Sequence, residues 1–245
     1  MRLRGACGVL TERASKEILA AYGFPVTREG LAATAEDAAR LAREIGYPVA
    51  LKIESPDITH KTEAGAIRLG LASEDAVRHA FDEVHQAARR YKPEARLQGA
   101  LVQEMVPAGL EVILGITNDP TFGPVVVAGL GGIHVELFRD VAYRIPPIDR
   151  IEALRMVREL KAYRLLEGLR GAPPRDIGAL ADLIVRISRL ALELGSDLAE
   201  LDINPLMLLE RGMGARVVDA LVIPAGQSEN RSAEGSQGGA TGNNH

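Results

Sequence analysis

The stretch Pro48-Val-Ala-Leu-Lys-Ile-Glu-Ser-Pro-Asp-Ile-Thr-His-Lys-Thr-Glu-Ala-Gly65 decides how the rest of the sequence is read. Its first part, Pro48 to Ile53, is short, apolar and partly β-branched, which predicts a buried strand. Strand character resumes from Ala66 to Ala72. The polar loop between these two strands is far longer than a hairpin needs, and this excess length points to a function.

The loop carries the groups needed to bind a phosphate and accept a phosphoryl group. It holds the hydroxyl of Ser55, the imidazole of His60, the ammonium group of Lys61, and Gly65. Backbone amides near a glycine form an anion-binding concavity, and a lysine adds a point charge. The alternative is a solvated loop with a surface histidine, which its composition alone also allows.

Lys52 lies inside the predicted strand, where an ammonium group is costly unless it is paired or faces a cleft. A lysine on an edge strand whose charged end reaches solvent is the alternative. Because the polar loop begins only a few residues later, we favour a phosphate-binding role for Lys52.

The remaining pattern predicts a mixed α/β fold with two subdomains that share a cleft. Adjacent strands must pair antiparallel because their connections are too short to cross over. We expect one domain over residues 1–226, with subdomain boundaries near 73 and 106–111, and a disordered tail over 227–245. The expected helices cover residues 11–22, 35–45, 73–91, 151–163 and 176–194. The other expected strands cover residues 97–106, 110–117, 124–128, 200–208 and 215–222.

The last two strands predict a metal site. If they form a hairpin that turns at Arg211 and Gly212, Asn204 pairs with Asp219, and their Cβ atoms lie about 5 Å apart on one face. One carboxylate and one amide oxygen suit Mg²⁺, which shares its remaining positions with phosphates and water. Asp202 lies on the same face. The alternative is a polar, exposed strand face.

Composition limits the classes of function. The net charge is −4, with 29 basic and 33 acidic residues, which argues against wholesale nucleic-acid binding. Cys7 is the single cysteine, so an intrachain disulfide and a cysteine-based metal site are excluded. No apolar run approaches the roughly 20 residues of a membrane span. We therefore expect a cytoplasmic location.

From about Leu10 to Ile223 the chain resembles the ATP-grasp portion of the NDP-forming acyl-CoA synthetases, which include relatives of the succinyl-CoA synthetase β subunit. The resemblance implies an ATP-grasp fold whose two subdomains enclose a nucleotide cleft. The matching stretches are Ala50-Leu-Lys-Ile53, Ser55-Pro-Asp-Ile-Thr-His-Lys-Thr-Glu63, Val102-Gln-Glu-Met-Val106, Glu111-Val-Ile-Leu-Gly115, Gly123-Pro124, Gly129-Leu-Gly-Gly132 and Glu200-Leu-Asp-Ile-Asn-Pro205.

The resemblance implies a role for each matching residue. Lys52 would contact the nucleotide phosphates, and His60 would accept a phosphoryl group. The hinge, composed of Gln103, Glu104, Met105 and Val106, would contact adenine through its backbone. The other implied residues are Glu111 near the ribose or phosphates, Gly131 and Gly132 near the terminal phosphates, and Asn204 and Asp219 as Mg²⁺ ligands.

One departure from the family pattern concerns the end of the loop. Many relatives carry two adjacent glycines where this sequence has Gly65-Ala66. An alanine is acceptable there only with a negative φ, so the start of the second strand is expected to differ slightly.

The implied reaction is acyl-CoA + ADP + phosphate ⇌ acid + CoA + ATP. The chain would be the nucleotide-binding subunit of this ligase. Its partner would be a CoA-binding α subunit that carries the acyl-CoA site and a second phosphohistidine, most simply in an α₂β₂ assembly. Two alternatives remain: a regulatory nucleotide-binding module in a protein acetyltransferase-type assembly, and another ATP-grasp carboxylate ligase. The second has no use for a histidine relay.

Overall fold

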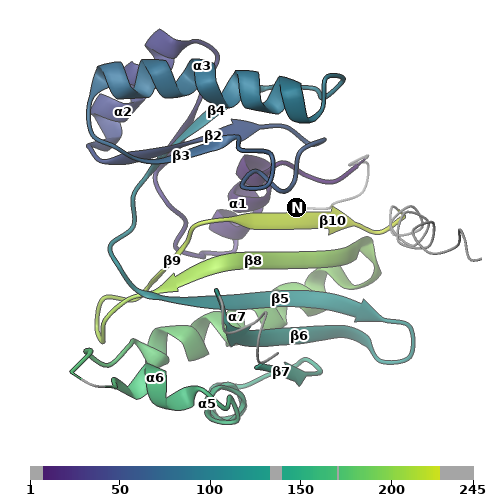
Figure 1. Cartoon of the computed structure of the whole chain (residues 1–245). Coiled ribbons are helices and arrows are strands. Elements are labelled where there is room, and N and C mark those ends of the chain that lie inside the picture. The colour runs from purple at the N-terminus through teal and green to yellow at the C-terminus, as the bar shows by residue number, and fades with distance from the viewer. Residues whose placement is uncertain (1–7, 133–139, 170, 227–245) are drawn as a thin grey trace, which may run out of the picture.

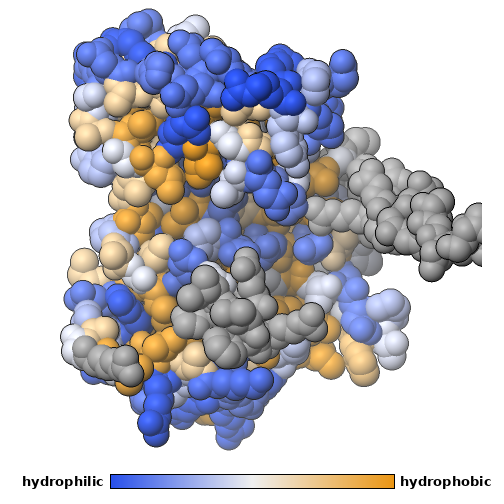
Figure 2. Space-filling model, in the orientation of Figure 1, coloured by the Kyte–Doolittle hydropathy of each residue, from blue (hydrophilic) through white to orange (hydrophobic). Residues whose placement is uncertain are grey.

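The computed structural model describes residues 8–132, 140–169 and 171–226. These residues form two lobes, each built from an antiparallel sheet with helices on its outer face (Figure 1). Helix α1 (Glu12–Ala21) lies between the two sheets. Figure 2 shows hydrophilic side chains over the outer end of the small lobe, where α3 lies, and hydrophobic side chains nearer the junction of the lobes. The mixed α/β class predicted from the sequence is confirmed.

The small lobe has a four-stranded sheet in the part of the chain that is described, with strand order β1-β4-β2-β3. Because side chains alternate along a strand, Val49 and Leu51 pack with the helices in one core cluster, while Lys52 points to the other face, toward the large lobe. The strands are β1 (Glu29–Ala32), β2 (Val49–Glu54), β3 (Ile67–Leu71) and β4 (Gly99–Glu104), and the helices are α2 (Ala35–Ile45) and α3 (Glu74–Tyr91).

The large lobe has strand order β10-β8-β5-β6-β7. Strand β9 also pairs with β8, at residues of β8 that follow those paired with β10. Its core includes side chains of β5, β8 and the apolar face of α7. The strands are β5 (Leu110–Asp119), β6 (Gly123–Leu130), β7 (Val141–Arg144), β8 (Leu198–Leu208), β9 (Ala215–Val217) and β10 (Ala220–Pro224). The helices are α5 (Arg150–Arg158), α6 (Tyr163–Glu167), α7 (Ile177–Leu194) and the short 3₁₀ helix η1 (Gly195–Asp197).

The first helices of the chain begin at hydroxyl side chains that cap them. The hydroxyls of Thr11, Thr34 and Ser73 each accept a hydrogen bond from a backbone amide three residues later. These bonds satisfy amide groups that the first helical turn leaves unpaired. Ile18 and Leu19 of α1 then pack into the core of the large lobe, which fixes α1 to that lobe.

The structure corrects three expectations about elements. Strands β1 and β7 were not predicted. The helix expected over 151–163 is wrong, because the Asp140 carboxylate accepts hydrogen bonds from the amides of Lys161 and Ala162 (both 2.8 Å) and the chain turns between α5 and α6. The strand expected over 215–222 is interrupted at Val218 and Asp219. The predicted tail, 227–245, lies outside the described residues.

In the described part of the chain, no helix is long and apolar enough to cross a membrane.

Candidate active site

A cavity opens at the junction of the two lobes. Its lining comes from the start of α1, the loop between β2 and β3, and the region where β8 faces the β9–β10 connection. Among the residues singled out from the sequence, the cavity brings together Ser55, His60, Lys61, Asp202, Asn204 and Asp219. The phosphate loop and the predicted metal site, far apart in sequence, therefore share one space.

The loop that carries His60 is held at both ends. Ser55 Oγ accepts a hydrogen bond from the Asp57 amide (3.1 Å). The Asp57 carboxylate accepts three from Arg96, one from its backbone amide (2.8 Å) and two from its guanidinium (3.0 and 2.8 Å). These bonds lower the pKa of Asp57 to about 2. The His60 carbonyl accepts from the Ala64 amide (3.1 Å), and Gly65 takes a φ of +62°, which favours glycine. His60 itself is exposed at the cavity.

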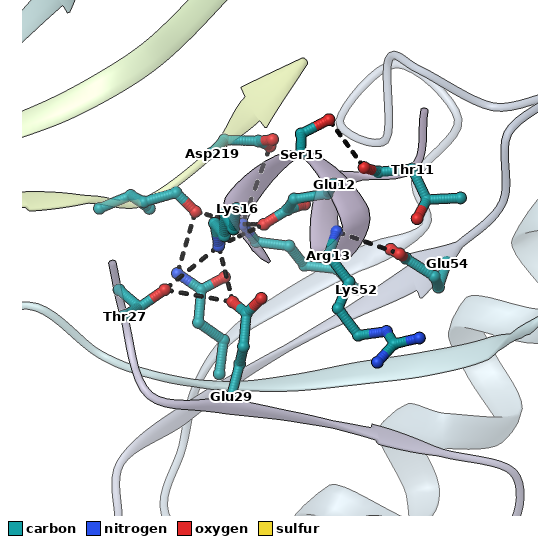
Figure 3. A network of polar contacts seen from close by, with 12 residues as sticks. Thr11, Glu12, Arg13, Ser15, Lys16, Thr27, Glu29, Lys52, Glu54 and Asp219 are labelled. Atoms are coloured by element: carbon teal, nitrogen blue, oxygen red, sulfur yellow. Dashed lines mark hydrogen bonds and ion pairs between the residues drawn. The ribbon is translucent and has the colours of Figure 1, made fainter. Parts of the chain in front are cut away.

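Lys52 and Lys61 are buried and converge on the carboxylate of Glu12. Figure 3 shows Glu12 and Lys52 in this cluster. Lys52 Nζ lies 2.8 Å from Glu12 Oε1, and Lys61 Nζ lies 2.9 Å from Glu12 Oε2. Both ammonium groups also lie near Asp219 Oδ2, at 3.8 and 3.9 Å. Burial opposes the charge of Lys61, but Glu12 and Asp219 outweigh it and raise its pKa.

Asn204 and Asp219 are paired as the hairpin predicts. The Asn204 amide donates to the Asp219 carbonyl (3.1 Å), and the flanking pairs, Ile203 with Ala220 and Leu206 with Val217, keep the same register. The two side chains line the same cavity.

The oxygen atoms that the side chains of this hairpin offer are suited to a divalent cation. Asp202 lies beside the pair, and its pKa is raised to about 6 by burial and by the negative charges of Glu200 and Asp219. A cation would relieve this repulsion. No group of three or more His, Cys, Asp or Glu among the described residues is arranged to hold a metal alone. Asn204 and Asp219 offer the oxygen ligands that suit Mg²⁺, which takes few protein ligands and shares the rest with phosphates and water.

The predicted hinge lies beside this cavity and does not line it. Gln103 is buried, and its Nε2 donates to the carbonyl of Val218 (3.1 Å), next to Asp219. Glu104 instead accepts hydrogen bonds from the amide and guanidinium of Arg28 (2.9 and 2.8 Å). Met105 is exposed and Val106 half-buried, where the chain passes from β4 to β5.

Glu111, Gly131 and Gly132 form a second group, outside the lining of this cavity. The Gly131 amide donates to the Glu111 carbonyl (2.7 Å). A Cβ at Gly131 would lie 2.9 Å from the Glu111 Cβ, so only glycine fits this close approach, and Gly132 has a φ of +62°. Residues 133–139, which continue this loop, lie outside the described residues.

Sequence reasoning missed Glu12 and Lys16. Glu12 Oε1 accepts a hydrogen bond from Lys16 Nζ (2.8 Å), and Lys16 also binds Glu29 (2.7 Å) and Thr27 (3.1 Å). A Glu and a Lys four residues apart on a helix are typical of a solvent-exposed pair. No local pattern marks this pair as buried, because Glu12 is the first residue of α1 and an i,i+4 pair reads the same on a surface helix.

Comparison with known proteins places the chain in a family. A family model described as an ATP-grasp domain matches residues 2–223. The chain is 47% identical over 214 residues to the β subunit of ADP-forming acetate–CoA ligase I of Pyrococcus furiosus, covering 87% of this chain and 91% of that protein. The chain belongs to the ATP-grasp β subunits of the ADP-forming acid–CoA ligases. The resemblance drawn from the sequence motifs is thereby confirmed.

Other relatives agree with this membership. The β subunit of acetate–CoA ligase II of P. furiosus is 43% identical over 217 residues, with 89% of this chain and 92% of that protein covered. Acetyl-coenzyme A synthetase 1 of Ca. Korarchaeum cryptofilum, solved with coenzyme A and Ca-AMPCP, superposes with a TM-score of 0.85 at 44% identity, covering 89% of this chain and 93% of that chain. This β subunit therefore has the ATP-grasp fold and binds ATP or ADP.

Proposed function

We propose that this β subunit transfers a phosphoryl group between His60 and a nucleoside diphosphate during ADP-forming acid–CoA ligation. The observation that carries the proposal is that His60, Lys61, Asn204 and Asp219 line one cavity at the lobe junction. In the direction of ATP synthesis, an ADP β-phosphate oxygen attacks the phosphorus of phosphohistidine that is protonated on its other ring nitrogen. The P–N bond breaks, its electron pair stays on the ring, and neutral His60 and ATP result. The reverse reaction phosphorylates His60 and releases ADP.

The residues around His60 would act by position and charge. Lys52, Lys61, Ser55 and Gly65 would hold the phosphate oxygens, because ammonium groups and loop amides offset the charge that gathers there. Holding the imidazole and phosphate at attack distance removes much of the entropic cost of transfer.

Asn204 and Asp219 would hold Mg²⁺ at the nucleotide phosphates. When bound, the ion neutralises repulsion between phosphate oxygens as they approach. A solved relative of K. cryptofilum (TM-score 0.76, 42% identical, covering 88% of this chain and 92% of that chain) contains Mg-AMPPCP and has its phosphohistidine segment pointing towards the nucleotide-binding site. This supports the same arrangement here.

The hinge and the glycine loop would bind the rest of the nucleotide. We assign Gln103, Glu104, Met105 and Val106 to the adenine, through their backbone. Glu111 would lie near the ribose or phosphates, with Gly131 and Gly132 near the terminal phosphates. The chain passes between the lobes at this hinge, so nucleotide contacts there would also fix the orientation of one lobe relative to the other.

The proposed partner is a CoA-binding α subunit that carries the acyl-CoA site and a second phosphohistidine, in an α₂β₂ assembly. Several relatives are named as β subunits of acetate–CoA ligases, which supports both a partner and acetate or another small acid as substrate. The acetate–CoA ligase I of Archaeoglobus fulgidus is a longer protein, of which the chain covers 28% at 46% identity.

The test is phosphorylation of His60. The full chain is incubated with Mg²⁺ and γ-labelled ATP, with and without the CoA-binding subunit, beside His60→Asn. We expect acid-labile, base-stable label on the wild type and none on the variant, with ADP affinity retained. The absence of label from the wild type in both conditions would refute the relay. A regulatory nucleotide-binding module would then be the better account.

A further inference from the structure

The carboxylate of Glu12 is the centre of a buried cluster of charges at the lobe junction (Figure 3). Its side chain is 0% exposed, and three ammonium groups lie within 2.9 Å of it: those of Lys16, Lys52 and Lys61. Burial opposes the charge of Glu12, but the three lysines hold its pKa well below the usual range, so the carboxylate stays ionised.

The contacts of Glu12 cross from one lobe to the other. Glu12 opens α1, whose Ile18 and Leu19 pack into the core of the large lobe. Lys52 belongs to β2 of the small lobe, and Lys61 belongs to the loop that follows it. Glu12 is therefore the point through which the large lobe sets the positions of two ammonium groups in the small lobe.

The other acidic groups near the cluster are not equivalent to Glu12. Glu29 of β1 contacts Lys16, at 2.7 Å, and the Glu54 carboxylate accepts from the Arg13 amide, at 3.1 Å. Asp219 lies farther from Lys52 and Lys61, at 3.8 and 3.9 Å. Of the described residues, Glu12 is the carboxylate that holds both ammonium groups at less than 3 Å.

We propose that Glu12, which lines the cavity, is a positioning residue for phosphoryl transfer. It fixes Lys61, which also lines the cavity, and Lys52, which is buried beside Glu12 and does not line it. Glu12 Oε1 holds Lys52 together with Lys16, and Oε2 holds Lys61, so the ammonium groups of Lys52 and Lys61 are placed before the nucleotide arrives. This role rests on the proposed function, since it concerns the same phosphate site. Groups fixed in advance stabilise developing charge without rearranging during the reaction.

The alternative is that Glu12 merely balances charge in a buried place. The cluster contains three acidic groups, Glu12, Glu29 and Asp219, and three lysines. A charge-balancing role predicts that removing one acid together with one lysine restores the wild-type rate constant of His60 labelling. A positioning role predicts that it does not, because Lys52 and Lys61 would still lack the group that holds them.

The experiment compares Glu12→Gln, Glu12→Gln/Lys16→Gln and the matched control Glu29→Gln with the wild type. The control removes a carboxylate from the same cluster but leaves the contacts of Glu12 with Lys52 and Lys61 intact. The full chain, with the CoA-binding subunit, is mixed with Mg²⁺ and γ-labelled ATP and quenched on a millisecond-to-second scale. The rate constant and the amplitude of His60 labelling are measured separately, together with the ADP dissociation constant.

We expect the rate constant to fall on the order of 10- to 100-fold in both variants that lack Glu12, because small displacements of catalytic groups have effects of this size. The ADP dissociation constant should change less than about threefold, while Glu29→Gln stays within about twofold of the wild type. Loss of folded protein would lower the amplitude and leave the rate constant unchanged. If Glu12→Gln does not fold, the charge-balanced double variant carries the test.

Two results would overturn the role of Glu12 while leaving the relay intact. They are a wild-type rate constant in the double variant, and an equal loss of rate in Glu29→Gln. The proposed function fails in a different way, because the wild type itself would then carry no label on His60.

Discussion

At the scale of single residues, the ion pair between Asp57 and Arg96 anchors the loop that carries His60. The carboxylate of Asp57 is 21% exposed and Arg96 76% exposed, so solvent screens the pair in part. The folded-state pKa of about 2 lies below the unfolded value near 3.9. This pair therefore stabilises the fold above pH 4, and the contribution is lost as the pH falls from about 4 to about 2.

We predict that Asp57→Asn lowers the free energy of unfolding by about 1–2 kcal/mol at pH 7, with a smaller difference at pH 3. Urea unfolding of both proteins at the two pH values measures this. Asp75→Asn is the control, because Asp75 is 98% exposed in its pair with Arg78 and should change stability by less than about 0.5 kcal/mol. A difference between wild type and Asp57→Asn that is the same at pH 3 and pH 7 would contradict the prediction.

Single-residue reasoning agrees with the structure on pairing and burial where the deciding contacts are local, while the phosphate role of Lys52 stays a prediction. The pairing of Asn204 with Asp219 follows from strand register alone, and Lys52 was identified because a lysine is out of place in an apolar strand. Glu12 was not found, since its partners Lys52 and Lys61 lie 40 or more positions away in the sequence. A sequence read locally cannot distinguish a buried i,i+4 pair from a surface one.

At the scale of elements, helices with clear capping residues were predicted with accurate limits, and short strands were not. Helix α2 begins after Thr34 and ends before Gly46, as expected. Among the described residues, strand β1 pairs only with β4, and it is four residues long with a glycine, so it has neither the length nor the alternation that marks a strand. Its place depends on tertiary pairing, which no local pattern encodes.

Close contact between β5 and β8 gives an element-scale prediction. A Cβ at Gly115 of β5 would lie 2.7 Å from the carbonyl oxygen of Leu201 in β8. Gly115→Ala should therefore push the strands apart and lower the free energy of unfolding by about 1–3 kcal/mol. Gly178→Ala is the matched substitution near the start of α7, where the nearest atom to the new Cβ is a side-chain nitrogen of Arg150 at 3.4 Å.

Gly178→Ala should raise the free energy of unfolding by about 0.5–1 kcal/mol, because alanine favours a helix over glycine. Denaturant unfolding of both variants measures whether the free energy of unfolding falls in Gly115→Ala and rises in Gly178→Ala. If Gly115→Ala is as stable as the wild type, strands β5 and β8 can accommodate the added methyl group without loss of stability, and the prediction is wrong.

At the scale of the whole molecule, α1 joins the two lobes. Its apolar side packs into the core of the large lobe through Ile18 and Leu19, while its first turn forms ion pairs with Lys52, Lys61 and Glu29 of the small lobe. A buried charge cluster loses its partners if either lobe opens, and unpaired buried charges are strongly unfavourable. The lobes should therefore unfold as one unit.

We predict that Leu19→Ala lowers protection from hydrogen exchange equally in α3 of the small lobe and α7 of the large lobe. Leu19 is 0% exposed, so its truncation should cost about 2–5 kcal/mol of global stability. If α1 couples the lobes, that cost appears in the slowest-exchanging amides of both helices, which report global unfolding. Mass spectrometry of exchanged peptides from wild type and variant measures it.

Val84→Ala serves as the reciprocal control, because Val84 lies in the core of the small lobe and is also 0% exposed. In a single cooperative unit it should reduce protection in α7 as much as in α3. Wild-type protection in the lobe that was not mutated, in either variant, would mean that the lobes open independently. The ion pairs of Glu12 would then have to break and re-form as the lobes move, and the nucleotide would have to restore the phosphate site each time it binds.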